Sequence, residues 1–489
     1  MRQLISQLMH RSPNYLPIFL IAIFALSILG WGEDKINRDG VGYIIDANLI
    51  NMGVVDSDQY LNHDRFFPSV LALIHKVTGM SFYVSSLAFN FLCLLLTSYS
   101  FLGILRLVSQ KKWLSWVGAL TIMVSVPLMD SYLTMTLRDH GMWAATLISM
   151  YMLIMFTQSH KKLYLFISLL SIILATLFRS ECYVFLIIPL CLIMNNFYSR
   201  QKIKFNRVGV ITILGSVLIL ITILIGVGLF FDLKQNYLYS RFTGLAAQLF
   251  QGMDLSTNQI WLKGHLEDYP VGIKLSILSF VFIKKWAVGL GIPTLFFVYL
   301  GFKSNLVQQK IKTILLFFLC ISAALVLGNL LATFSITVRY FMLHYLVLYI
   351  FMALGLYNFL LLQPPRSIYL KLIGFLMIAC LIIQGIGNVY DTPHQNEEKM
   401  AAEWLIGKNI GVDQAYVGDL RIRYYLNQLN RPEHTLEQVI NTDQQRYQYL
   451  VVNKTEMDKV IKLAHYYPIH FLPNDKEPKI IIFSVKDLQ

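Results

Sequence analysis

The chain alternates long apolar runs with short polar segments over most of its length. A helix that crosses the bilayer core of about 30 Å needs about 20 consecutive apolar residues. The two runs on either side of Arg179 are shorter, so a re-entrant hairpin is an alternative there. The pattern predicts about eleven transmembrane helices, at residues 15–31, 82–105, 113–129, 142–156, 163–178, 183–194, 208–231, 288–302, 314–334, 341–362 and 372–386.

Basic residues are concentrated on one side of this pattern. With the N-terminus taken as cytoplasmic, the inner segments contain 16 Lys and Arg residues and no Asp or Glu. The first outer segment, 32–81, carries seven acidic residues against four basic ones. Because positive charge marks the cytoplasmic side, we expect a multi-pass protein of a bacterial inner membrane, with a periplasmic C-terminus. An uncleaved first helix is favoured over a signal peptide, since the apolar run is long and no clear small-x-small cleavage site precedes Glu33.

Two outer segments and the C-terminal part are long enough to form structures of their own. Within 32–81, the stretches 40–52 and 68–77 are amphipathic enough to lie on the membrane surface. Segment 232–286 is rich in tyrosine, tryptophan and basic residues, and its apolar run 275–283 is too short to span. After residue 390, periodicity predicts helices at 399–410, 422–428 and 456–466, and strands at 415–418, 447–452 and 480–485.

The predicted fold class is a polytopic α-helical membrane protein with a small C-terminal periplasmic α/β domain. The predicted domains are a transmembrane module, 1–390, with outer loops 32–81 and 232–286, and a soluble domain, 391–489. Composition agrees, because 56% of residues are hydrophobic, 14% are charged and the mean hydropathy is +0.56. Soluble domains average about a quarter charged residues.

Net charge and cysteine content exclude some partners. The net charge of +13 lies in short clusters between apolar runs, which indicates contact with membrane lipids and not with nucleic acid. The five cysteines lie in or beside apolar segments without a CxxC motif, so we predict neither a disulfide framework nor a metal site. His265, Glu267 and Asp268 also lack metal-ligand spacing.

Residues 38–53, RDGVGYIIDANLINMG, place charged residues directly after the first apolar run. A helix that begins near Asp39 puts Asp39, Tyr43 and Ala47 on one face and Asp46 on another. The helix N-terminus favours an ionised carboxylate. Taken alone, Asp39 is most simply interpreted as an N-cap.

Charged residues recur at the predicted outer ends of other spans. Asp139 opens one span in LRDHGMW, Arg179 and Glu181 lie in FRSECY, and Arg339 and Tyr340 lie in VRYF. Each alone is typical of an interfacial anchor. Together they place acids and arginines at one depth, where charges usually face a cavity or each other. Such a cavity suits a lipid-linked phosphate, since arginine offers paired donors to phosphate oxygens and a carboxylate can accept a hydroxyl proton.

The ordered motifs resemble the GT-C type membrane glycosyltransferases, in the branch of protein O-mannosyltransferases and lipid A aminoarabinose transferases. Many members carry two adjacent acids in the first loop, whereas this chain has Asp39-Gly40, which leaves Asp34 or Asp46 to share the role. The resemblance covers essentially the whole chain, in order: Asp39, Tyr43 and Ala47; Gly53; Phe67-Pro68 before a helix ending at Thr78-Gly79; LRD at 137–139; FRSE at 178–181; RY at 339–340; AAEWL at 401–405.

This resemblance implies an inverting transferase of hexosyl or pentosyl groups for cell-envelope biogenesis, with a polyprenyl-phosphate sugar as donor. The acceptor is a glycan, a lipid such as lipid A, or a protein. By position, Asp39 would be a catalytic base or orient the acceptor, and Asp139 would be the second acid of the cavity. Arg179 and Arg339 would bind the phosphate. Substrate contacts are also expected from Tyr43, Tyr340 and Glu181.

Two points stay open at this stage. Some members of the resembled family need a divalent cation and others do not, so the sequence does not decide on a cofactor. The alternative function is a non-enzymatic transporter or a lipid-linked-sugar flippase. Transporters commonly show two related halves and helices broken near the middle of the bilayer. The chain shows no internal repeat, and its charged residues gather at one rim, which favours the enzyme.

Overall fold

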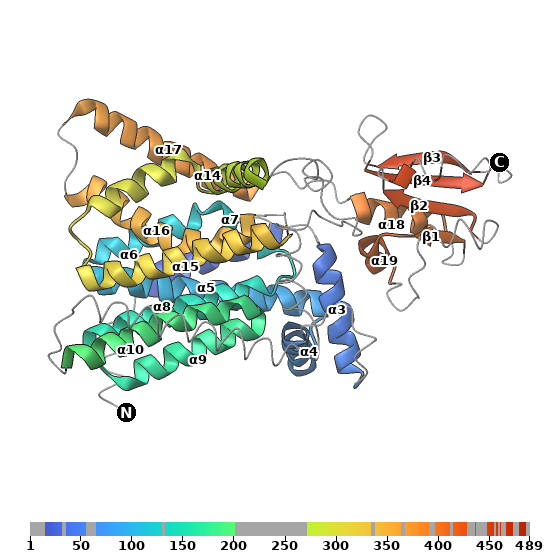
Figure 1. Cartoon of the computed structure of the whole chain (residues 1–489). Coiled ribbons are helices and arrows are strands. Elements are labelled where there is room, and N and C mark those ends of the chain that lie inside the picture. The colour runs from blue at the N-terminus through green and yellow to red at the C-terminus, as the bar shows by residue number, and fades with distance from the viewer. Residues whose placement is uncertain are drawn as a thin grey trace. The chain divides into compact units, whose positions relative to one another are not determined.

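A computed structural model gives the fold of the chain (Figure 1). The predicted span 208–231 and positions 232–270 of the predicted outer loop lie outside the described residues, as do Asp34, His265, Glu267 and Asp268. The structure describes residues 15–31, 36–54, 65–129, 133–200, 271–333, 338–362, 367–390, 397–410, 414–427, 436, 447–453, 456–457, 460, 466–472 and 479–485.

Internal contacts divide the chain into two compact units. The second unit groups the predicted first outer loop with the predicted C-terminal domain, and the predicted boundary at residue 390 stays a prediction. The first unit holds Met1–Ile28, Asn90–Leu133 and Arg138–Val389, and the second holds Leu29–Phe89, Thr134–Leu137 and Tyr390–Gln489.

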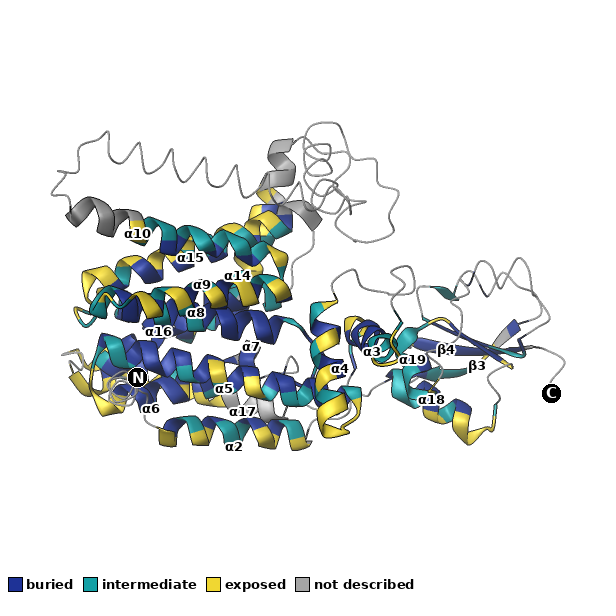
Figure 2. Ribbon diagram, turned by 90° about the horizontal axis from the view of Figure 1, so that it is seen from below, coloured by how far each residue is buried: buried dark blue, intermediate teal, exposed yellow. Residues whose placement is uncertain are grey.

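The first unit is a helical bundle organised around α16 (Met342–Tyr357). Every residue of α16 is buried, and the helix contacts α6, α8, α14 and α15 (Figure 2). The helices that lie wholly or mostly in this unit are α2 (Tyr15–Trp31), α5 (Phe82–Val108), α6 (Lys112–Met123), α7 (Val126–Met129), α8 (Asp139–Ser159), α9 (Lys162–Phe178), α10 (Ile187–Arg200), α14 (Val271–Lys303), α15 (Gln309–Thr333), α16 and α17 (Ile368–Tyr390), with the short turns η3 (Ser180–Leu186), η4 (Val338–Phe341) and η5 (Asn358–Leu362).

Four helical segments of the described chain are long and apolar enough to cross a membrane. They are Phe82–Val108, Asp139–Ser159, Gln309–Leu330 and Val338–Leu362. A fifth is present if Leu278–Ala287 and Gly289–Lys303, bent by 71° within α14, count as one span. Mostly helical structure with several apolar helices supports the predicted membrane protein, and the count of about eleven spans stays a prediction.

Helices α14 and α16 approach each other closely through two glycines. A Cβ atom on Gly301 would lie 1.8 Å from the Phe351 carbonyl oxygen, and one on Gly355 would lie 1.9 Å from that of Phe297. Only glycine permits this backbone separation. The contact fixes α16, whose N-terminus follows directly on the turn η4 that carries Arg339 and Tyr340.

The second unit contains a mixed four-stranded sheet in the order β1-β2-β4-β3. Strands β1 and β2 are parallel, whereas β4 is antiparallel to both β2 and β3. The elements of this unit are α3 (Arg38–Asn51), α4 (Phe66–Thr78), α18 (Glu397–Gly407), β1 (Ala415–Val417), α19 (Leu420–Tyr425), β2 (Tyr449–Asn453), β3 (Tyr466–Leu472) and β4 (Ile480–Val485).

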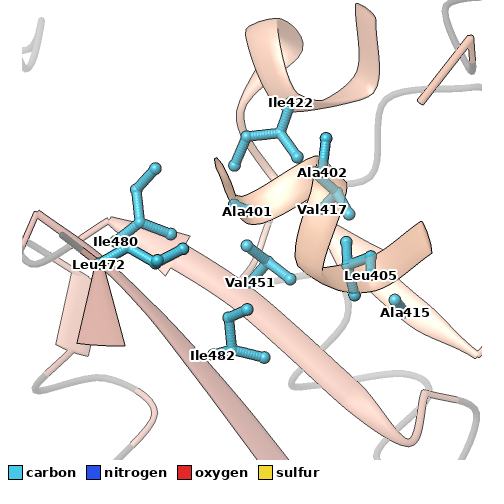
Figure 3. Packing of buried hydrophobic residues seen from close by; sticks show 10 residues of the cluster. All are labelled: Ala401, Ala402, Leu405, Ala415, Val417, Ile422, Val451, Leu472, Ile480 and Ile482. Carbon is cyan, nitrogen blue, oxygen red and sulfur yellow. The ribbon is translucent and has the colours of Figure 1, made fainter. Parts of the chain in front are cut away.

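Alternating side chains bury both faces of this sheet, because successive residues of a strand point to opposite sides. Val451 and Ile482 pack on one face with residues of α18 and α19 (Figure 3). Leu450, Ile481 and Phe483 pack on the other face. The amphipathic helices α18 and α19 therefore cover one side of the sheet.

Strand β3 departs from the sequence-based prediction. Tyr466 was expected to end a helix, but it is the first residue of β3; most of that predicted helix, 456–466, lies outside the described residues. Pro468 lies at an irregularity of the pairing with β4. Proline is tolerated there because β3 lies at the edge of the sheet formed by the described strands, and proline within sheets is found at edges and irregularities.

Candidate functional site

Arg179 binds two carboxylates in the first unit. Its Nη1 donates to Oδ1 of Asp139 at 2.5 Å, and its Nε donates to Oε1 of Glu181 at 2.8 Å. The Asp139 side chain is 4% exposed and that of Arg179 is 12% exposed, whereas Glu181 is 38% exposed. The Arg179–Asp139 ion pair is therefore buried, whereas the Arg179–Glu181 pair is partly exposed.

Local backbone geometry brings these residues together. Helix α9 ends at Phe178, and Arg179 is extended, with φ −148° and ψ 112°, before η3 begins at Ser180. This single extended residue turns its side chain toward the start of α8. Gly141 makes room for the approach, since a Cβ there would lie 2.5 Å from the Phe178 ring.

Arg339 and Tyr340 join the cluster from the turn η4. The guanidinium carbon of Arg179 lies 4.9 Å from the centre of the Tyr340 ring, and that of Arg339 lies 5.4 Å from it. Both distances are within the range of cation–π attraction. Arg339 and Arg138 are also close enough to attract the Asp139 carboxylate. The structure thus brings together four predicted site residues around Arg179, although their roles stay predictions.

The cluster contains both acids of the described part of the first unit. Asp139 and Glu181 are the only carboxylate residues among the described positions of that unit, and both bind Arg179. Arg138 and Arg339 lie near enough to attract Asp139 as well. Charged residues at membrane depth usually face a cavity or each other, and here arginines and acids are grouped together.

Two further residues near the start of α8 were not singled out from the sequence. His140 is buried, and its ring lies 4.7 Å from that of Trp143. Trp143 lies four residues after Asp139, on the same helix face. Its buried indole N–H has no hydrogen-bond partner among the described residues. A buried donor of this kind is available to an oxygen of a ligand. The polar DH pair in LRDHGMW was the available signal for His140.

Asp39 and Tyr43 belong to the second unit, and their convergence with Asp139 stays a prediction. The N-cap of α3 is Asn37, and Asp39 lies in the first turn of the helix. The interpretation of Asp39 as the N-cap is therefore wrong. Asp39 is exposed, whereas Asp46 is fully buried. Tyr43 is buried edge-on against Phe67, with ring centres 5.0 Å apart. This contact matches ordinary packing.

Gly40 explains why this chain lacks a second acid next to Asp39. A Cβ at position 40 would lie 2.6 Å from the Asn37 Oδ1 atom and 2.8 Å from the Thr136 Cβ atom. A carboxylate side chain does not fit there unless the Thr134–Leu137 segment shifts. The departure from the two-acid pattern is therefore built into the packing of α3.

Helix α19 packs against α3 within the second unit. Leu420, Tyr424 and Tyr425 contact a cluster of buried residues that includes Val41 and Ile44. The Tyr425 hydroxyl also accepts a hydrogen bond from the Ile36 backbone N–H at 3.4 Å. The C-terminal part of the chain thus holds the helix that carries Asp39.

The described residues contain no group of three or more His, Cys, Asp or Glu side chains arranged to hold a metal ion. Both carboxylates of the first-unit cluster are already bound to Arg179. In the described part of the chain, these two carboxylates therefore do not form a metal site with further ligands of this kind.

The scan against protein-family models and the search of curated proteins gave no match. Among solved structures, the chain is similar to the crystal structure of ArnT from Cupriavidus metallidurans in the apo state, with 12% sequence identity and a TM-score of 0.39. The similarity covers 96% of this chain and 97% of that chain. The identity and the TM-score are too low to assign this chain to a family.

Proposed function

We propose that the chain is an inverting glycosyltransferase that moves a sugar from a polyprenyl-phosphate donor to an acceptor at the periplasmic face of a bacterial inner membrane. The observation that carries this proposal is the cluster around Arg179. Both described acids of the first unit bind this one arginine, beside Arg339 and Tyr340. Together with the ordered motifs of the sequence, the grouping of Arg179 with Arg339 supports a phosphate-bearing substrate, because arginine offers paired donors to phosphate oxygens.

Arginine suits the leaving group of this reaction. The glycosyl C–O bond breaks with both electrons passing to the phosphate oxygen, so negative charge grows on the lipid phosphate. Guanidinium groups already in place stabilise that charge in the transition state. Asp139 and Glu181 act as positioning residues for Arg179, because their hydrogen bonds fix the plane of its guanidinium. Arg339 then provides a second set of donors for the phosphate.

The acceptor hydroxyl attacks the anomeric carbon from the face opposite the phosphate, which inverts the configuration. Its proton passes to a carboxylate, and Asp39 is the proposed base because its side chain is exposed. Asp46 is an inferior candidate, since it is fully buried. The acceptor is an envelope saccharide, a lipid or a protein. The products are the glycosylated acceptor and polyprenyl phosphate.

Binding of polyprenyl phosphate to the purified chain tests the role of Arg339. Arg339→Ala removes a charge-assisted contact and should weaken binding by about tenfold or more. Polyprenol, which has the same chain without phosphate, should bind both proteins alike. Lys371→Ala is the matched control, because it removes one charge on α17 outside the cluster. The role of Arg339 would be contradicted if Arg339→Ala weakened the binding of polyprenyl phosphate and of polyprenol equally. An equal loss of polyprenyl-phosphate affinity in Arg339→Ala and Lys371→Ala would also contradict it.

A further inference from the structure

A polar cavity with a volume of about 800 Å³ lies within the first unit. It is lined by the last turn of α5 with the residues after it, the last turn of α8 with His160, and the chain around the start of α15. Its size falls within the range of small-molecule sites, about 300–1,000 Å³.

The lining is cationic and rich in amides. Arg106 and Lys310 supply positive charge, and the amide side chains of Gln110, Gln158 and Gln308 supply neutral donors. No carboxylate is among the lining residues. The carboxyl ends of α5 and α8 place partial negative charge nearby, so the attraction for an anion comes from the side chains.

Specific contacts hold the walls of the cavity. The Gln158 side-chain amide donates to the Leu107 carbonyl oxygen at 3.3 Å, which ties the end of α8 to α5. His160 closes α8 in a left-handed conformation, with φ 55°, and its N–H donates to the Phe156 oxygen at 2.7 Å. Among the lining residues, Ile311 is buried, whereas Lys310 is exposed. The shape therefore comes from the backbone, and the charge is accessible.

The cavity is remote from the Arg179 cluster. Asp139 is the first residue of α8, and the cavity lies at the other end of this 21-residue helix. At 1.5 Å per residue the separation is about 30 Å, the thickness of a bilayer core. The segments that surround the cavity, 106–112, 159–162 and 303–312, contain basic residues and no acid. By the positive-inside rule the cavity faces the cytoplasmic leaflet.

We infer that this cavity binds the phosphate headgroup of an anionic lipid from the cytoplasmic leaflet. Basic pockets between membrane helices on this side suit such headgroups. Helix α15 continues from Lys310 into exposed apolar side chains, including Leu316 and Phe317. Acyl chains can pack along these side chains while the headgroup stays at the helix ends. Free phosphate gains no such apolar contact, which favours a lipid as the source of the phosphate.

Native mass spectrometry of the full chain in detergent tests this inference. Phosphatidylglycerol should remain bound under conditions that remove phosphatidylcholine. Each cation near a headgroup contributes about a fivefold change in affinity, so Arg106→Gln with Lys310→Gln should weaken phosphatidylglycerol binding about 25-fold. Lys310→Gln alone should weaken it about fivefold, and its exposed position leaves folding intact.

Lys371→Gln is the control, because it removes one cytoplasmic-side charge outside the cavity. The inference holds if the cavity variants bind phosphatidylglycerol more weakly while the control variant binds it as the parent does. The melting temperatures of all variants without lipid should equal that of the parent. It is overturned if the Lys371→Gln control loses as much affinity as Lys310→Gln, or if the Lys310→Gln variant binds like the parent. A competition experiment with inorganic phosphate tests the source of the phosphate group. If inorganic phosphate displaces phosphatidylglycerol at equal concentration, the assignment of the cavity to a lipid is overturned.

Discussion

The two acids that bind Arg179 differ sharply in burial. Asp139 is 4% exposed at its side chain, and Glu181 is 38% exposed. Removing one partner from a buried ion pair leaves an uncompensated charge, whereas a solvent-exposed pair contributes little. The burial of Asp139 makes it the more important of the two for holding Arg179.

This difference gives a prediction for stability. Asp139→Asn should lower the free energy of unfolding by about 3 kcal/mol, because Arg179 then remains buried with one partner fewer. Glu181→Gln should lower it by less than about 1 kcal/mol. Thermal unfolding of the detergent-solubilised variants measures both. A larger loss for Glu181→Gln than for Asp139→Asn would contradict the burial argument.

The residues of the cluster could be selected from the sequence, but their pairing could not. Acids and arginines at the ends of apolar runs are visible as a pattern. That Arg179 binds both acids depends on its extended backbone and on Gly141, which are properties of the fold. Helix periodicity likewise placed Asp39 and Asp46 on different faces of one helix. Which of these faces is buried depends on the elements that pack against α3 in the fold.

At the scale of elements, the contact between α14 and α16 gives the sharpest prediction. Gly301→Ala should destabilise the protein by about 3 kcal/mol or more, since its new methyl group would overlap the Phe351 carbonyl oxygen. Gly328→Ala on α15 is the matched control, because no described atom lies within 4 Å of its Cβ position. It should be neutral or stabilise the helix by up to about 1 kcal/mol. Similar melting temperatures for the two variants would refute the proposed contact.

Helix α19 carries a pH-dependent contact in a part of the chain that lies outside the predicted spans. Asp419 caps this helix, and its carboxylate accepts hydrogen bonds from the Arg421 backbone N–H and side chain at 2.8–3.1 Å. Burial opposes ionisation of Asp419, but the hydrogen bonds and charge of Arg421 outweigh it and lower the pKa below its usual 3.8. The ionised carboxylate therefore stabilises the folded state above that value, and the stabilisation is lost as the pH falls through the folded pKa.

Asp419→Asn should consequently destabilise the C-terminal part of the chain at pH 5 and have less effect at lower pH. Pepsin cleavage within residues 397–485 measures this, as the ratio of variant to parent rates at each pH. The ratio should be above one at pH 5 and fall toward one as the parent carboxylate becomes protonated. A ratio that does not change with pH would contradict the role assigned to Asp419.

Apolar periodicity predicted the helices well because bilayer-length runs have few alternative structures. It did not predict their interruptions. The predicted run 113–129 is divided into α6 and α7 by a break at Val124 and Ser125. Pro127 lacks the N–H that would continue the helix. In β3, the aromatic residues and Pro468 gave no alternating pattern, and only the pairing with β4 defines the strand.

At the scale of the whole molecule, the Arg179 cluster lies at one end of α8 and a basic cavity lies at its other end. We propose a lipid-linked sugar as the ligand of the first and a membrane lipid as the ligand of the second. The positive-inside pattern predicts an orientation from the sign of charge in short loops alone, and this orientation stays a prediction. Recognition of one sugar or acceptor depends on side-chain positions, which periodicity and charge do not encode.

Mass spectrometry of cell-envelope glycans tests the central claim, that the chain transfers a sugar, most directly. The comparison uses the parent bacterium, a deletion strain, and deletion strains that carry the wild-type chain or Asp39→Asn at equal membrane levels. We predict that one saccharide unit disappears from an envelope glycan on deletion, returns with the wild-type chain and stays absent with Asp39→Asn. Identical envelope glycans in the parent and the deletion strain would contradict the assignment as a glycosyltransferase.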